Sequence, residues 1–73
     1  MFKKGDQVLL ALTGAGYTSF DSFFVKKVDG DGVWLDNGPG NRPTGPFDAE
    51  TGECKGYMMP GFTQKIVPKR IGR

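Results

Sequence analysis

The sequence predicts a mainly β fold, a small barrel of about five short antiparallel strands with at most one short helical turn. Apolar residues alternate with polar residues over short runs, which is the period of half-buried strands. Segments rich in glycine, proline and aspartate separate these runs and are typical of turns. The stretch 19–36 holds three of the six phenylalanines and the only tryptophan, on either side of Asp29-Gly30-Asp31-Gly32. This pattern predicts a β-hairpin with a tight Asp-Gly turn.

The length limits the architecture to a single domain. Seventy-three residues lie near the lower limit at which a hydrophobic core stabilises a chain without disulfides or metals. Nine aromatic residues supply much of the available burial, since each can bury about 150–250 Å². We expect residues 1–68 to form one small β domain and residues 69–73 to form a flexible basic tail.

The first predicted strand follows Gly5. Alternation places Val8, Leu10 and Leu12 on one face of it. A helix is excluded, because the glycine-rich segment 13–16 would end it within two turns. Residues 14–18 are expected to form a loop.

The second predicted strand, residues 20–28, is apolar on both sides. One small sheet cannot bury both sides, so either the strand passes between two sheet layers or Phe23 stays partly exposed. A short third strand, residues 33–36, places Trp34 opposite its two aliphatic neighbours. The apolar residues on one side of the second strand are Phe20, Phe24 and Val28, and those on its other side are Phe23 and Val25.

The second half of the chain is richer in turns. Three prolines within residues 39–46 predict a loop and argue against a central strand. Residues 47–53 fit a hairpin with a bulge at Gly52, and a single helical turn over residues 46–50 is the alternative. Residues 62–67 form the last predicted strand, which Pro68 ends.

The sequence offers little to catalysis or to metal binding. It has no histidine, and its single cysteine, Cys54, cannot form an internal disulfide, which favours a reducing cytoplasm. A dinucleotide loop at residues 14–19 is excluded because Ser19 stands where the third glycine is needed. A calcium loop is excluded because Val33 and Gly40 occupy ligand positions. We expect no enzyme, no catalytic residue, no metal and no cofactor.

Charge and aromatic content leave two kinds of partner open. The net charge of +2 is mild for a nucleic-acid-binding domain, although lysines beside aromatic residues can track phosphates and stack bases. The chain also carries more large apolar residues than its interior can hide, which favours a protein-binding face. The candidates for binding a protein are Phe23, Trp34, Lys26, Lys27 and Arg42. The candidates for binding nucleic acid are Lys3, Lys4, Lys26, Lys27, Lys69 and Arg70.

Two segments carry resemblances to known proteins. The segment 4–8, KGDQV, followed by a loop, a long strand and an Asp-Gly turn, resembles SH3-like small barrels of the KOW or Tudor type. The segment 45–52, GPFDAETG, resembles small proteins of tailed bacteriophages. Size, mild basicity and the lack of histidine are similar to those of a phage transcription regulator that binds bacterial RNA polymerase.

The phage resemblance implies a non-enzymatic module. It would dock on a host RNA polymerase subunit in the host bacterial cytoplasm and modulate transcription initiation and termination. We expect no membrane segment and a monomer when the protein is free. The alternatives are a small barrel that binds single-stranded RNA or DNA and a structural phage assembly protein.

Overall fold

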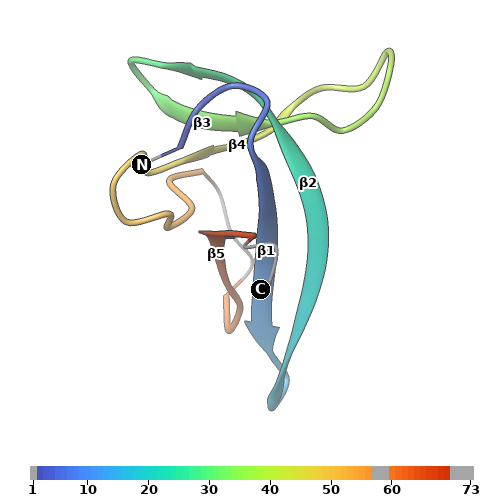
Figure 1. Ribbon diagram of the computed structural model, residues 1–73. Coiled ribbons are helices and arrows are strands. Elements are labelled where there is room, and N and C mark those ends of the chain that lie inside the picture. The colour runs from blue at the N-terminus through green and yellow to red at the C-terminus, as the bar shows by residue number, and fades with distance from the viewer. Residues whose placement is uncertain (1, 57–59, 70–73) are drawn as a thin grey trace.

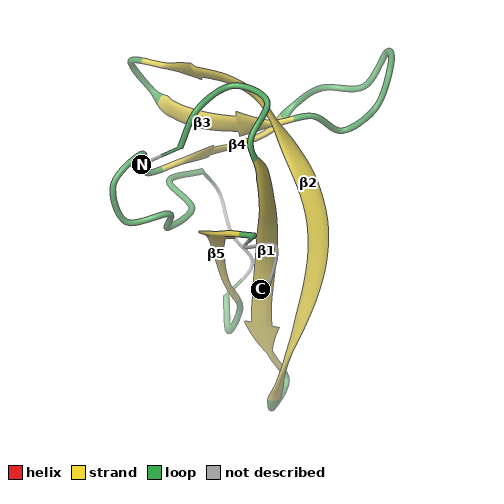
Figure 2. Cartoon of the chain, viewed as in Figure 1, coloured by secondary structure: helices red, strands yellow, loops and turns green. Residues whose placement is uncertain are grey.

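A computed structural model describes residues 2–56 and 60–69, and over these ranges the chain is all-β (Figures 1 and 2). Five antiparallel strands form one curled sheet in the order β4-β3-β2-β1-β5. The predicted fold class is therefore confirmed. The strands are β1 (Gln7–Gly14), β2 (Tyr17–Asp29), β3 (Gly32–Leu35), β4 (Thr44–Phe47) and β5 (Thr63–Pro68).

The long strand β2 allows the sheet to curl. Its first half pairs with β1 and its second half pairs with β3. The register shifts between Val25 and Lys27, so Lys26 is an extra residue in a bulge. A bulge increases the local twist and bends its strand. β2 therefore turns from one part of the sheet into the other, as Figure 1 shows.

The segment 52–55 closes the barrel between β4 and β5. It forms isolated bridges with Phe47 on one side and with Lys65 on the other. The observed connection after β4 is thus the predicted hairpin with Gly52 in a left-handed conformation. The alternative helical turn at residues 46–50 does not form, and a single bond from Gly52 N–H to Asp48 O (2.8 Å) tightens residues 48–52 instead. The bonds of the closure run from Asp48 N–H to Glu53 O (2.7 Å), Lys55 N–H to Pro46 O (2.9 Å), Cys54 N–H to Gln64 O (3.0 Å) and Ile66 N–H to Gly52 O (2.8 Å).

The core lies inside the curl of the sheet and draws on every strand. Alternate residues of β1 and β3 point inward, as the sequence pattern predicts for the first strand. Phe23, Ala49 and Cys54 pack against this core and are partly buried. The buried residues are Phe2, Val8, Leu10, Val25, Val33, Leu35, Phe47 and Ile66.

The two sides of β2 are not equally buried. Val25 is buried and Phe23 is half-buried against the core, whereas Phe20 and Phe24 are 60% and 56% exposed. The strand does not pass between two sheet layers. Phe20 and Phe24, rather than Phe23, are therefore the largely exposed phenylalanines of this strand.

A two-residue turn, and not the longer loop predicted for residues 14–18, joins β1 to β2. Gly14 pairs with Tyr17, and the turn residues Ala15 and Gly16 have φ angles of 51° and 87°. Two consecutive positive φ angles are the mark of a type I′ turn, whose preferred residues are Asn-Gly. Alanine is strained at such an angle, because its Cβ approaches the following carbonyl oxygen.

We expect Ala15→Asn to stabilise the protein by about 0.5–1 kcal/mol, since asparagine tolerates this conformation and the change touches nothing else. Urea unfolding followed by tryptophan fluorescence measures the difference. Ala15→Val is the control and is expected to destabilise the protein, because a β-branched residue tolerates positive φ least. An asparagine variant less stable than the parent would contradict this account of the turn.

Candidate functional site

One side of the β2-β1-β5 sheet faces away from the core and carries five apolar residues among polar ones. In β1 and β5 the residues that alternate with Val8, Leu10 and Ile66 point to this side. The register places them beside the exposed residues of β2. We call this surface the outer face; its apolar members are Leu9, Ala11, Phe20, Phe24 and Val67.

The two phenylalanines are the most prominent residues of the outer face. Phe20 lies opposite Ala11 and Phe24 lies opposite Gln7, so neither ring has a large apolar neighbour across the strand pair. Both rings are more than half exposed. Large apolar side chains left exposed on one face of a sheet are typical of interaction sites.

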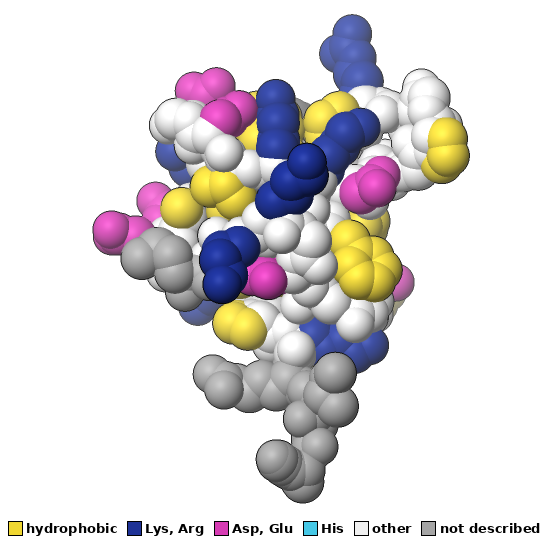
Figure 3. Space-filling view, turned by 45° about the horizontal axis from the view of Figure 1, so that its top comes forward, with side chains coloured by type: hydrophobic (Ala, Val, Ile, Leu, Met, Phe, Trp, Pro, Cys, Tyr) yellow, Lys and Arg dark blue, Asp and Glu magenta, His cyan; other side chains and the backbone are white. Residues whose placement is uncertain are grey.

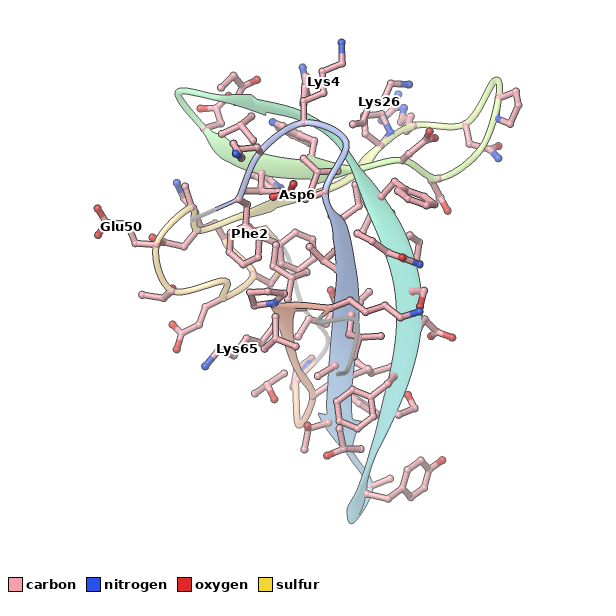
Figure 4. All side chains as sticks on the ribbon, viewed as in Figure 1. Phe2, Lys4, Asp6, Lys26, Glu50 and Lys65 are labelled. Carbon is pink, nitrogen blue, oxygen red and sulfur yellow. The ribbon has the colours of Figure 1, made fainter. Side chains whose placement is uncertain are left out.

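Lysines border the outer face. Lys65 of β5 pairs with Ala11 and projects into solvent, as Figure 4 shows. Lys69 donates from its backbone N–H to Gln7 O (3.2 Å) and from Nζ to Ser22 Oγ (3.2 Å). Lys69 is therefore attached to the sheet, although the sequence assigns it to a flexible tail. The outer face thus combines an apolar centre with a basic border.

A second cluster joins the strands of the β2–β3 hairpin. Trp34 Nε1 donates to Asp29 Oδ1 (3.1 Å), and Lys27 Nζ lies 3.4 Å from Asp29 Oδ2. The same Nζ lies 5.3 Å from the centre of the Trp34 ring, which is within the range of a cation–π interaction. Trp34 and Lys27 therefore interact with each other and with Asp29. These contacts engage the Trp34 indole N–H and the Lys27 ammonium, the polar groups that the two residues could offer to a partner.

The pKa of Asp29 is lowered from its ordinary value of 3.8, first by the Trp34 hydrogen bond and then by the Asp31 N–H and by Lys27. A carboxyl whose pKa falls on folding stabilises the fold above its unfolded pKa, and this contribution is lost as the pH falls through the folded pKa. We expect the Trp34 indole N–H resonance to titrate below pH 3.8 in a proton NMR series. Asp29→Asn should abolish that titration; a midpoint above 3.8 in the parent would contradict the hydrogen-bonded cluster.

The five residues predicted to bind a protein do not share one face. Phe23 points inward with Val25, whereas Trp34 alternates with buried residues of β3 and points to the opposite side of the sheet. Lys26 is exposed in the bulge. Arg42 is exposed in the loop 36–43, which projects from the end of the hairpin opposite its turn (Figure 1). The structure thus brings together Lys27 and Trp34 alone of this set.

The lysines predicted to bind nucleic acid fall into two places. Gly5 N–H donates to Val25 O (2.9 Å), which holds the segment before β1 against the bulge of β2. Lys4 and Lys26 therefore project from the same end of the molecule (Figure 4), where Figure 3 shows basic side chains gathered. Lys3 and Lys27 neighbour them in the sequence, whereas Lys69 lies at the outer face. Arg70 lies outside the residues that the structure describes.

The sequence analysis missed Phe20 and Phe24 as exposed anchors. The alternation along β2 already separates them from Phe23 and Val25. Asp21 would have suggested the reverse assignment, because this charged residue shares the side of Phe23 and Val25 and lies opposite the buried Leu10. The pattern alone could not decide which parity faced the core, because both carry apolar residues.

A shallow depression beside Cys54 is lined by residues of the closing segment and β5. Within residues 2–56 and 60–69, no group of three or more Cys, Asp or Glu side chains could hold a metal ion. Over the same ranges, no helix has the length and apolar character that a membrane crossing requires. Comparison with protein-family models, with curated proteins and with solved structures finds no match.

Proposed function

We propose that the protein is a non-enzymatic module that binds another protein through its outer face. The observation that supports this function most directly is the exposure of Phe20 and Phe24 on the same sheet surface as Lys65 and Lys69. Aromatic residues are enriched at the centres of protein interfaces, where they fill pockets and exclude water. A chain this short gains stability from every ring that it buries, so two exposed rings fit a role outside the fold.

The proposed partner is a subunit of bacterial RNA polymerase, and the proposed effect is a change in transcription initiation or termination. This proposal rests on the resemblance to phage regulators, as does a location in the host cytoplasm. The outer face adds a physical requirement. An apolar centre bordered by Lys65 and Lys69 fits an apolar patch that is bordered by carboxylates. The kinship with SH3-like barrels is likewise a proposal, supported by five short antiparallel strands in a curled sheet.

The double substitution Phe20→Ser and Phe24→Ser is expected to weaken binding to purified RNA polymerase at least about tenfold, since truncated aromatic anchors commonly cost more than about 1–2 kcal/mol. Biolayer interferometry with immobilised polymerase measures the affinity. Val28→Ser is the matched control, because Val28 is 40% exposed and does not belong to the outer face. Equal affinities of the double variant and the parent would exclude the outer face, and no binding by the parent would exclude this partner.

Single-stranded nucleic acid is the second candidate, favoured by the same neighbourhood of rings and lysines. Bases stack on exposed aromatic side chains, and lysines contact the phosphates. An affinity for single-stranded RNA or DNA that falls steeply with added salt would support this alternative. If the outer face instead binds a protein, no oligonucleotide should bind to it at any salt concentration.

A further inference from the structure

The first half of β2 leaves one of its two edges open. Residues 17–23 pair with β1 on one side, and no strand of the described part of the chain pairs with them on the other. Figure 1 shows β2 forming the margin of the sheet over this length. The open edge ends at the turn of residues 15–16 on one side. It ends at Phe24 on the other, because the Phe24 carbonyl accepts the N–H of Asp36 (2.8 Å) and β3 occupies this edge of β2 from there on.

The ladder determines which backbone groups point away from β1. Val25 N–H donates to Asp6 O (2.8 Å), and Val25 O accepts the N–H of Gly5, so both groups of Val25 point toward the β1 side. The direction alternates along an antiparallel strand. The N–H and C=O groups of Thr18, Phe20 and Ser22 therefore point to the open edge.

This edge lacks the features that usually prevent pairing with another chain. Natural edges are protected by proline, lysine, bulges or short length. The stretch 17–23 contains no proline, no lysine and no bulge, and its only charged residue is Asp21. Seven residues in extended conformation are enough for a further strand to pair along them.

We propose that a second copy of this chain pairs antiparallel with this edge, forming a two-fold symmetric dimer with a continuous sheet. The ends of the open edge select the register. Only a pairing centred on Phe20 uses all of residues 17–23 in both copies. A shift in one direction would run each strand into β3 of the other copy, and a shift in the other direction would leave part of the open edge unpaired. This inference goes beyond the proposed function and replaces the monomer expected from the sequence.

The side chains are self-complementary in that register. Phe20 of one copy lies opposite Phe20 of the other, and cross-strand aromatic pairs stabilise a sheet. Thr18 lies opposite Ser22, so hydroxyl groups face hydroxyl groups. Asp21 lies opposite Ser19, which keeps the two carboxylates from facing each other directly. The backbone hydrogen bonds fit this register as well. Thr18, Phe20 and Ser22, whose N–H and C=O groups point to the open edge, lie opposite one another in the two copies.

Ser22→Pro tests the dimer with little cost to the monomer. Proline removes an N–H that points to the open edge, so the ladder to β1 stays intact. Ser22→Ala is the matched control: it keeps the N–H and removes only the hydroxyl that accepts from Lys69. Sedimentation equilibrium of the full chain should show a concentration-dependent dimer for the parent and for Ser22→Ala. Ser22→Pro should raise the dissociation constant at least about tenfold, because the two-fold dimer loses the hydrogen bond from the residue 22 N–H to the partner copy in both of its halves.

Hydrogen exchange identifies the edge itself. Raising the protein concentration should slow exchange of the Thr18, Phe20 and Ser22 amides and leave the exposed Arg42 amide unchanged. A parent that stays monomeric at millimolar concentration would overturn the proposal. A dimer that Ser22→Pro leaves intact, with folding verified by circular dichroism, would overturn it too, since the copies would then associate through another surface.

Discussion

Phe47→Ala is expected to lower the free energy of unfolding by about 3–5 kcal/mol, the range for truncating a buried phenylalanine. Phe47 is fully buried and is the largest side chain in the innermost core. It pairs with Val33 of β3 and bridges to Cys54 of the closing segment, so its ring lies where the two ends of the sheet meet. A single domain of this size has a total stability of roughly 4–11 kcal/mol. The substitution should therefore remove a large part of the total stability of the fold.

Urea unfolding monitored by circular dichroism measures this loss, and a linear extrapolation gives the free energy in water. Phe20→Ala is the control for residue type. Phe20 is 60% exposed, so its removal should change the stability by no more than about 0.5–1 kcal/mol. Similar losses for the two variants would mean that the core does not centre on Phe47.

The sequence was most informative where the pattern had a single interpretation. Val8 and Leu10 share the side of the strand that alternates with Gln7, Leu9 and Ala11, and the structure buries both. The hairpin at residues 29–32 forms as predicted, although its turn residues Gly30 and Asp31 do not take the positive φ angles; Gly32 does, at 133°. Local residue choice thus determined the presence of the elements, while the details of the turn depended on the pairing of Gly32 with Asp29.

Strand β4 was missed because proline was interpreted too strictly. Three prolines between residues 39 and 46 argued for a loop, yet Thr44–Phe47 forms a strand that contains Pro46. β4 stands at one end of the sheet order, and the carbonyl of Pro46 takes part in the closure because it accepts the N–H of Lys55. Proline lacks only the donor, so it is tolerated where a neighbour needs an acceptor.

The candidate site was less accessible to sequence reasoning than the fold. The composition correctly indicated more aromatic residues than the core could hold, since Tyr17, Phe20 and Phe24 are exposed. It could not indicate which ones, because β2 is apolar on both sides. The choice depended on long-range pairing: Phe23 lies opposite Val8 and Val25 lies opposite Leu35, and both partners are buried.

Gly52→Ala is expected to be nearly as disruptive as the loss of Phe47, although it adds only a methyl group. Gly52 has a φ angle of 82°, and a Cβ atom there would overlap the carbonyl oxygen of Ile66. The positive φ costs an alanine about 1–2 kcal/mol, and the overlap with rigid backbone adds about 1–3 kcal/mol. The total loss should reach about 3 kcal/mol, because β5 must move away from the closing segment.

Gly40 serves as a matched control that separates the cost of the positive φ angle from the cost of the overlap with β5. Gly40 has a φ angle of 76°, and a Cβ atom there would have no neighbour within 4 Å. Gly40→Ala should therefore lower the free energy of unfolding only by the cost of the positive φ angle. The difference between the two variants then measures the closeness of Gly52 to β5. Hydrogen exchange gives a local reading, because the Ile66 amide bonds to Gly52 O (2.8 Å) and should lose protection selectively in Gly52→Ala. Equal destabilisation by the two substitutions would mean that the closing segment does not lie against β5, and that the barrel is open on that side.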